Sequence, residues 1–181
     1  MMLTNEQAKK LLKLARDSIS SHFQKKFDAP ADIKEEFSEK QGAFVTLYKN
    51  NELRGCIGYS EPIFPLYKAV VEAAQASAFS DPRFVPVIED EINNIKIEVS
   101  VLTKPVRIEF KDSEELLRQI KIGKDGLIIE RGLLLPQVAV EYNWNAKEFL
   151  ENTCMKAGLP ADYWKETNVK IYKFQTQIFD E

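Results

Sequence analysis

The stretch that decides the fold reads Ala43-Phe-Val-Thr-Leu-Tyr-Lys-Asn-Asn-Glu-Leu-Arg-Gly-Cys-Ile-Gly-Tyr59. A run rich in β-branched and aromatic residues, 43–49, is followed by Asn50-Asn51, a dipeptide suited to a tight turn, and then by the segment 53–59 as the return strand. This pattern predicts a hairpin of strands 43–49 and 53–59. The rest of the chain is expected to pack around it.

Side chains alternate between the two faces of a strand, so the second strand of this hairpin should have two different faces. We expect Arg54 and Cys56 to project together from one face, beside Gly58. Residues two apart in a strand are about 6.5–7 Å apart, so the guanidinium could reach the sulfur. A neighbouring arginine favours the thiolate, the nucleophilic form of cysteine. The opposite, apolar face would carry Leu53, Ile57 and Tyr59.

The composition is that of an ordinary globular protein. Of 181 residues, 44% are hydrophobic and 29% charged, and this length suits one domain or two small subdomains. No apolar run approaches the length of a membrane span, and the first residues show no secretory signal, so we expect a cytoplasmic protein. The net charge of −3 argues against a general nucleic-acid binder.

The few cysteines and histidines narrow the chemistry further. Cys56 and Cys154 are far apart in sequence and form no C-x-x-C pair, which fits a reducing compartment. His22 is the single histidine, so multi-histidine metal sites are excluded, and we expect neither a metal nor a cofactor. We interpret His22 as a partly buried packing residue and Cys154 as a small core residue.

Capping signals and apolar spacing predict four helices. Thr4 and Gln7 form a capping box that opens a helix to about Lys26, and Asn145 and Glu148 form another. The predicted helices cover residues 5–26, 66–79, 113–120 and 146–157.

Further strands are predicted from short apolar or alternating runs. Alternation is clearest from Ile95 to Leu102, where every second residue is Ile or Val. Strands joined by hairpins, with helices packed on them and no βαβ repeat, indicate an α+β fold with mainly antiparallel sheets. The remaining predicted strands are 106–110, 127–130, 133–135 and 169–179.

Three polar positions outside the hairpin stand out. Asp81 lies at a helix exit, where it either forms a turn with Arg83 or serves a site. Glu98 joins a site only if its face of the strand is also the face of Cys56. Gln137 follows Pro136 in an apolar run, so it either satisfies the backbone at a bend or faces a ligand.

With these motifs set out, the chain resembles the AMMECR family, whose prokaryotic members form the A component of the AmmeMemoRadiSam set. The matches are co-linear over nearly the whole chain. Tyr59 and Asp125 depart from forms seen in parts of the family, which have Thr and His there, so no role of that His carries over. The matching motifs are Gly42-Ala-Phe-Val-Thr-Leu47, Leu53-Arg-Gly-Cys-Ile-Gly58, Asp81-Pro-Arg-Phe-Val-Pro-Val87, Ile97-Glu-Val-Ser-Val101, Leu134-Leu-Pro-Gln-Val138 and Lys156-Ala-Gly-Leu-Pro160.

The resemblance implies one AMMECR-type domain over residues 1–181, built of two packed subdomains. Their expected junction is near 104–106, and the Arg54-Gly55-Cys56 motif would lie near a shared cleft. The resemblance also implies functional linkage to a Memo-like protein and a radical S-adenosylmethionine protein. It supplies no reaction.

Three hypotheses follow for the motif. In the first, the protein is an enzyme or protein-modification component in which Cys56 is the nucleophile or covalent acceptor and Arg54 its activator. In the second, Arg54 and Arg83 bind a small anion or an acidic peptide without catalysis. In the third, the glycines and Cys56 only pack. The predicted substrate-binding residues are Gly55, Gly58, Asp81, Arg83, Glu98 and Gln137.

Overall fold

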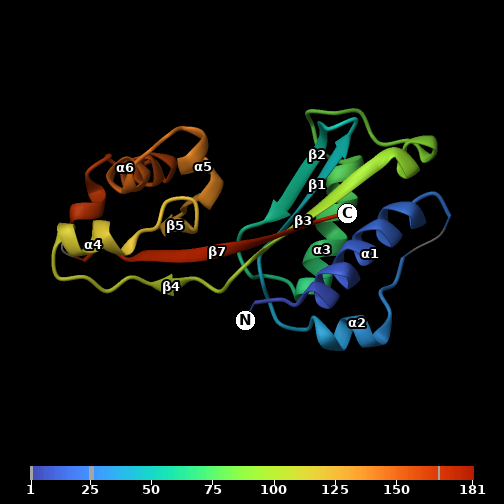
Figure 1. The fold of residues 1–181 in the computed structure, drawn as a ribbon, viewed down its shortest axis with the longest axis horizontal. Helices are drawn as coiled ribbons and strands as arrows, with labels where there is room; N and C mark the ends of the chain where they lie inside the picture. The colour runs from blue at the N-terminus through green and yellow to red at the C-terminus, as the bar shows by residue number, and fades with distance from the viewer. Residues whose placement is uncertain (1, 25–26, 167) are drawn as a thin grey trace. The chain divides into compact units, whose positions relative to one another are not determined.

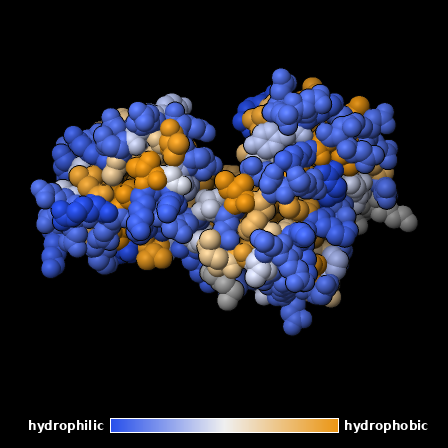
Figure 2. Space-filling model, viewed as in Figure 1, coloured by the Kyte–Doolittle hydropathy of each residue, from blue (hydrophilic) through white to orange (hydrophobic). Residues whose placement is uncertain are grey.

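The computed structural model describes residues 2–24, 27–166 and 168–181. The chain divides into two compact units: unit 1 comprises residues 1–102 with 177–181, and unit 2 comprises residues 103–176. Within the described residues, no helix is long and apolar enough to cross a membrane. Hydrophilic residues cover most of the visible face of each unit, interrupted by small hydrophobic groups (Figure 2).

Unit 1 combines an antiparallel sheet with helices (Figure 1). Strand β1 lies between β2 and β3, and the far end of β7 adds to the free side of β3. The elements of this unit are α1 (Asn5–Ser21), α2 (Ala31–Glu36), β1 (Ala43–Lys49), β2 (Glu52–Tyr59), α3 (Leu66–Phe79), the 3-10 helix η1 (Glu89–Asn94), β3 (Ile95–Leu102) and the end of β7 (Ile171–Asp180).

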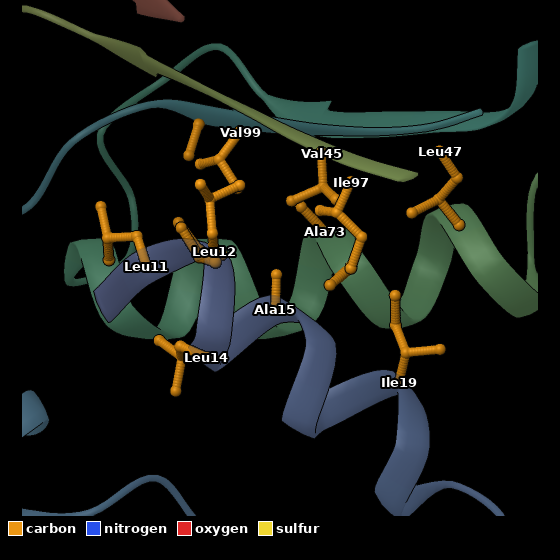
Figure 3. Packing of buried hydrophobic residues seen from close by; sticks show 14 of the residues in the cluster. Leu11, Leu12, Leu14, Ala15, Ile19, Val45, Leu47, Ala73, Ile97 and Val99 are labelled. Atoms are coloured by element: carbon orange, nitrogen blue, oxygen red, sulfur yellow. The ribbon is translucent and has the colours of Figure 1, made fainter. Parts of the chain in front are cut away.

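The core of unit 1 lies between the sheet and the helices α1 and α3 (Figure 3). Every second residue of β1 and β3 points into this core, as the alternation predicts. The opposite face of these strands is more polar, although Phe44 also lies on it. The side chains that meet in the core include Leu11, Ala15 and Ile19 of α1, Ala73 of α3, Val45 and Leu47 of β1, and Ile97 and Val99 of β3.

The predicted hairpin is confirmed. Lys49 pairs with Glu52 across a loop of two residues. Asn50 and Asn51 have φ of 53° and 64°, the left-handed conformation that a two-residue hairpin turn of type I′ requires and that asparagine tolerates well.

Unit 2 is a smaller antiparallel sheet packed against helices. Strand β5 pairs with β6 on one side and β7 on the other, and β4 also pairs with β7. Phe149 and Trp164 are among the largest side chains of its core. The elements are β4 (Val106–Arg107), α4 (Ser113–Gln119), β5 (Asp125–Ile129), β6 (Gly132–Leu134), α5 (Pro136–Glu141), α6 (Ala146–Lys156), the 3-10 helix η2 (Tyr163–Lys165) and the beginning of β7.

The α+β prediction is confirmed, whereas several boundaries are corrected. Helix α1 ends at Ser21, where a run of serines weakens the helix; Lys26, its predicted end, lies outside the described residues. Strand β4 ends at Arg107, before the predicted Phe110. Helix α2 covers a segment for which no helix was predicted.

Helix α5 corrects the prediction of a bend at Pro136. Proline is the first residue of this helix, a position where its missing N–H has no helical partner to lose. A short apolar run does not distinguish a strand from a helix, so the sequence pattern could not settle this segment.

Candidate functional site

A β-bulge in β2 changes which residues share a face. Thr46 pairs with Cys56 and Tyr48 pairs with Leu53, so Arg54 is an additional residue in the strand. Directly paired residues of antiparallel strands lie on the same face. Leu53 therefore shares the face of Cys56, and the prediction that it lies with Ile57 is wrong, because one inserted residue inverts the alternation beyond it.

The Arg54 side chain binds the segment that precedes β3. Its Nη2 and Nε donate to the Glu91 carboxylate at 3.0 and 3.3 Å, and Nη1 donates to the Val85 carbonyl at 2.9 Å. These bonds, together with one from Lys49, lower the pKa of Glu91 to about 2. The guanidinium thus braces the chain at Val85 and Glu91.

The prediction that the Arg54 guanidinium approaches the Cys56 thiol is wrong. The Arg54 guanidinium goes to Glu91, whereas the Cys56 sulfur faces Thr46. A different arginine, Arg83, contacts Cys56: its Nη2 donates to the Cys56 carbonyl at 3.0 Å.

Asp81 and Arg83 hold the backbone of Cys56 on both sides. The Cys56 N–H donates to Asp81 Oδ2 at 2.9 Å, and Arg83 completes the arrangement through its bond to the Cys56 carbonyl. Arg83 also donates to Asp81 from its backbone N–H and from Nε and Nη2. The predicted Asp81–Arg83 turn is therefore confirmed, and the same carboxylate reaches the hairpin.

We call Asp81, Arg83 and their bonds to the Cys56 backbone the Asp81–Arg83 clamp, and ionic interactions strengthen it. The Asp81 side chain is 1% exposed, and hydrogen bonds from the Arg83 side chain, then from backbone N–H groups, hold the pKa of its carboxyl group well below the usual range. Asp81 in turn raises the pKa of Arg83. Asp81 is therefore a charged group at neutral pH, and its charge is matched within the clamp.

The Cys56 thiol lies in a row of polar residues across three strands. The Thr46 hydroxyl donates to Cys56 Sγ at 3.4 Å, and Thr46 pairs on its other side with Glu98 of β3. Cys56, Thr46 and Glu98 therefore share one face of the sheet, which is the condition under which Glu98 was expected to join the site.

Two ionisable groups on this face have raised pKa values. Burial, and then the charge of Asp180, raises the pKa of Glu98. Burial also raises the pKa of Tyr48, with further contributions from Glu98 and Cys56. A carboxyl group whose pKa moves toward neutrality is better suited to accept and return a proton.

The two glycines of the motif allow close packing. A Cβ on Gly55 would lie 2.1 Å from the Ser77 carbonyl oxygen of α3, so no larger residue fits there. A Cβ on Gly58 would lie 2.5 Å from the ring of Phe44, its cross-strand partner. This geometry gives both glycines a packing function, and their predicted contact with substrate stays a prediction.

Comparisons with known proteins identify the family. The AMMECR1 family model matches residues 12–179. The chain belongs to the AMMECR1 family. The resemblance inferred from the sequence motifs is thereby confirmed.

Proteins of several archaea align with the chain almost end to end. Protein MJ0810 of Methanocaldococcus jannaschii is 49% identical over 186 residues, covering 99% of this chain and 92% of its own. Protein PF1979 of Pyrococcus furiosus is 48% identical over 190 residues, covering 99% and 90%. The crystal structure of Uncharacterized Protein PH0010 from Pyrococcus horikoshii matches with 47% identity and a TM-score of 0.81, covering 99% and 93%.

Gln137, Cys154 and His22, which the sequence analysis also singled out, lie outside the hairpin. Gln137 is the second residue of α5 in unit 2, and no role in a site follows from its position. Cys154 is fully buried in the core of unit 2, where burial raises the pKa of its thiol, as expected for a packing residue. His22 is exposed rather than partly buried, and its ring stacks on Phe79 at 3.8 Å.

Sequence reasoning missed three residues: two on the sheet face of Cys56 and one that binds Arg54. Extending the hairpin register from the Asn50-Asn51 turn pairs Tyr48 with Leu53, but without the bulge it would pair Thr46 with Gly55, so the position of Thr46 opposite Cys56 had no local signal. Glu91 carried no local signal, because its partnership with Arg54 links residues 37 apart.

Proposed function

We propose that this AMMECR1-family protein is a thiol-dependent transfer or modification protein in which Cys56 is the nucleophile or covalent acceptor. The observation that supports the proposal is that three residues form hydrogen bonds with Cys56. Asp81 binds its N–H, Arg83 binds its carbonyl, and the Thr46 hydroxyl donates to its sulfur. A nucleophile that is fixed in position loses less entropy when it reacts.

The neighbouring groups suit the chemistry of a thiol. A hydroxyl that donates to the sulfur stabilises the thiolate over the thiol. In this proposal Glu98, which lies on the same face with Thr46 between it and Cys56, takes up the proton of the thiol through the Thr46 hydroxyl or a water molecule. The thiolate would then attack an electrophilic carbon of the substrate, and the leaving group would depart with a proton returned by Glu98.

Arg83 is the residue best placed to orient an anionic substrate in this proposal. Its side chain is 53% exposed although it is paired with Asp81, so part of the guanidinium faces solvent. A Memo-like or radical S-adenosylmethionine protein, the partners that the family resemblance implies, would be a candidate source of the reacting group.

The alternative of an anion-binding module has less support, because it needs two free arginines. Arg54 donates to Glu91 and to two carbonyl groups, and its side chain is only 12% exposed. Arg83 remains the one arginine of the pair whose side chain is largely exposed.

Site-resolved alkylation tests the proposal. Iodoacetamide is added at several pH values, and mass spectrometry follows Cys56 and Cys154 separately in the same sample. We expect Cys56 to react faster than glutathione at pH 7, and Thr46→Val to slow Cys56. Buried Cys154 is the internal control for intact folding. If Cys56 reacts no faster than glutathione at any pH, the nucleophile is rejected.

A binding experiment separates the two alternatives. Cys56→Ser and Arg83→Ala are compared for binding of inorganic phosphate and an acidic peptide. Unchanged binding by Cys56→Ser, together with loss of binding in Arg83→Ala, would favour the anion-binding module if Cys56 also proves unreactive.

A further inference from the structure

The loop between α3 and η1 exposes large apolar side chains. Val85 is 76% exposed and Ile88 is 59% exposed, and Pro86 between them is exposed as well. Single exposed apolar residues are common on protein surfaces, but a group of them within four residues is characteristic of an interaction site. The loop follows directly from the Asp81–Arg83 clamp.

This loop is held in place by bonds from several elements. Val87 is buried, and its N–H donates to the Ala78 carbonyl at 2.9 Å. Arg54 donates to the carbonyls of Val85 and Pro86. The Ile88 N–H donates to Glu91, the carboxylate that also binds Arg54. The side chains of Val85 and Ile88 are therefore presented on an ordered backbone, so binding there would cost little ordering entropy.

The charge next to the apolar residues is negative. Glu89 and Asp90 follow Ile88 and are exposed, and within the described part of the chain neither has an ionic or hydrogen-bonded partner. The cations of this region each have an acidic partner, since Arg54 and Lys49 contact Glu91 and the half-exposed Arg83 is paired with Asp81. The surface thus combines exposed apolar side chains with two unmatched carboxylates.

We propose that Val85, Ile88, Glu89 and Asp90 form a docking surface for a segment of another protein that carries apolar side chains beside Lys or Arg. Apolar contact would provide the buried centre of the interface, and the carboxylates would attract the basic residues at its rim. Complementary charge argues for this occupant over two others. A second copy of the chain would bring the same acids together, and an anionic lipid surface would repel them. The surface is independent of the chemistry proposed for Cys56.

Selection from a displayed library of random 12-residue peptides tests the proposal. The wild-type protein is compared with the double variant Val85→Ser/Ile88→Ser and with Val106→Ser, a matched control whose side chain is 63% exposed in unit 2. All three substituted residues are exposed, so we expect equal urea midpoints, which checks that the fold is intact.

We expect wild type and Val106→Ser to enrich the same peptides, with Lys or Arg beside apolar residues. The double variant should lose this enrichment by at least about tenfold. A synthetic peptide of the enriched sequence should bind Glu89→Gln/Asp90→Asn several-fold more weakly than wild type, with the difference shrinking at high salt.

Three results would overturn the proposal: no enriched peptides, enrichment of acidic peptides, or enrichment that persists in the double variant. Sedimentation velocity covers the remaining occupant. A dimer of wild type that is absent in Val85→Ser/Ile88→Ser would assign the surface to a second copy of the chain.

Discussion

The backbone N–H of Cys56 donates to Oδ2 of Asp81 at 2.9 Å, which joins the exit of α3 to the hairpin. The carboxylate is buried and its other bonds come from Arg83, so this one residue fixes a turn and a strand together. Neither residue alone would mark a site, but together they fix the backbone of the residue that carries the thiol.

Replacing Asp81 with Asn should destabilise the protein. The neutral amide loses the charge pairing with Arg83 and can place an N–H against an existing donor. We expect the free energy of unfolding to fall by about 2 kcal/mol. The loss is no larger because half of the Arg83 side chain is exposed, so solvent screens the ion pair. Urea denaturation followed by circular dichroism measures the change.

Asp180→Asn is the matched control for that experiment. The Lys96–Asp180 ion pair is at least half exposed on both sides, so its loss should lower the free energy of unfolding much less than Asp81→Asn does. Equal losses in the two variants would contradict a special role for the buried carboxylate.

Stability should decrease in acid. The folded-state pKa of Glu91 is about 2, below its ordinary 4.5, and that of Asp81 is also lowered. Carboxyl groups with a depressed folded-state pKa contribute stability above their unfolded-state pKa and lose it as the pH falls through the folded-state value. We therefore expect the free energy of unfolding to fall between about pH 5 and pH 2.

Glu91→Gln tests the share of one group in this pH dependence. The variant should lose about 1–2 kcal/mol at pH 7, and its stability should vary less between pH 5 and 2 than that of wild type. Urea midpoints over a pH series provide the comparison. A variant curve parallel to that of wild type would show that Glu91 is not linked to folding.

Gly55→Ala should be severely destabilising. The new methyl group would lie 2.1 Å from the Ser77 carbonyl oxygen, and that oxygen belongs to a packed helix backbone. Separating α3 from β2 would also disturb Ser77 Oγ, which donates to the Val45 carbonyl and accepts from the Ile57 N–H. We expect a loss of about 3 kcal/mol or more in thermal or urea unfolding.

Glu52→Ala on the same strand is the comparison for Gly55→Ala. Its side chain is exposed, so its substitution should stay within about 0.5 kcal/mol of wild type. Full retention of stability by Gly55→Ala would mean that the helix can move away from the strand without cost.

The two arginines near the hairpin should affect different properties. Arg54→Ala removes the brace to Glu91 and should lower the free energy of unfolding by about 1–3 kcal/mol, while Cys56 alkylation changes less than about twofold. Arg83→Ala should instead change the alkylation of Cys56, because Arg83 contacts its carbonyl and its partner Asp81. The reverse result would restore Arg54 as the activating cation that its sequence position suggested.

Local signals predicted much of the fold. The Asn50-Asn51 turn, the capping boxes at Thr4 and Asn145 and the alternation of β3 depend on neighbours in sequence, and each feature formed as expected. The bulge at Arg54 could not be predicted in this way. Its guanidinium bonds residues more than 30 positions away, so the energy that favours the inserted residue comes from tertiary contacts.

The same limit applied to the candidate site. Sequence reasoning singled out Cys56, Asp81 and Arg83 but paired the thiol with Arg54, because alternation in a regular strand places them together. The clamp itself requires knowing that the end of α3 lies beside β2, a relationship between distant segments that no local pattern contains.

Strand β7 has a consequence for the order in which the chain can fold. Residues 177–181 belong to unit 1, where Gln177 Oε1 accepts the Leu3 N–H across a separation of 174 residues. During synthesis, β3 therefore emerges from the ribosome with one edge unpaired and waits for a strand that follows all of unit 2. The unit that is synthesised first is the one completed last.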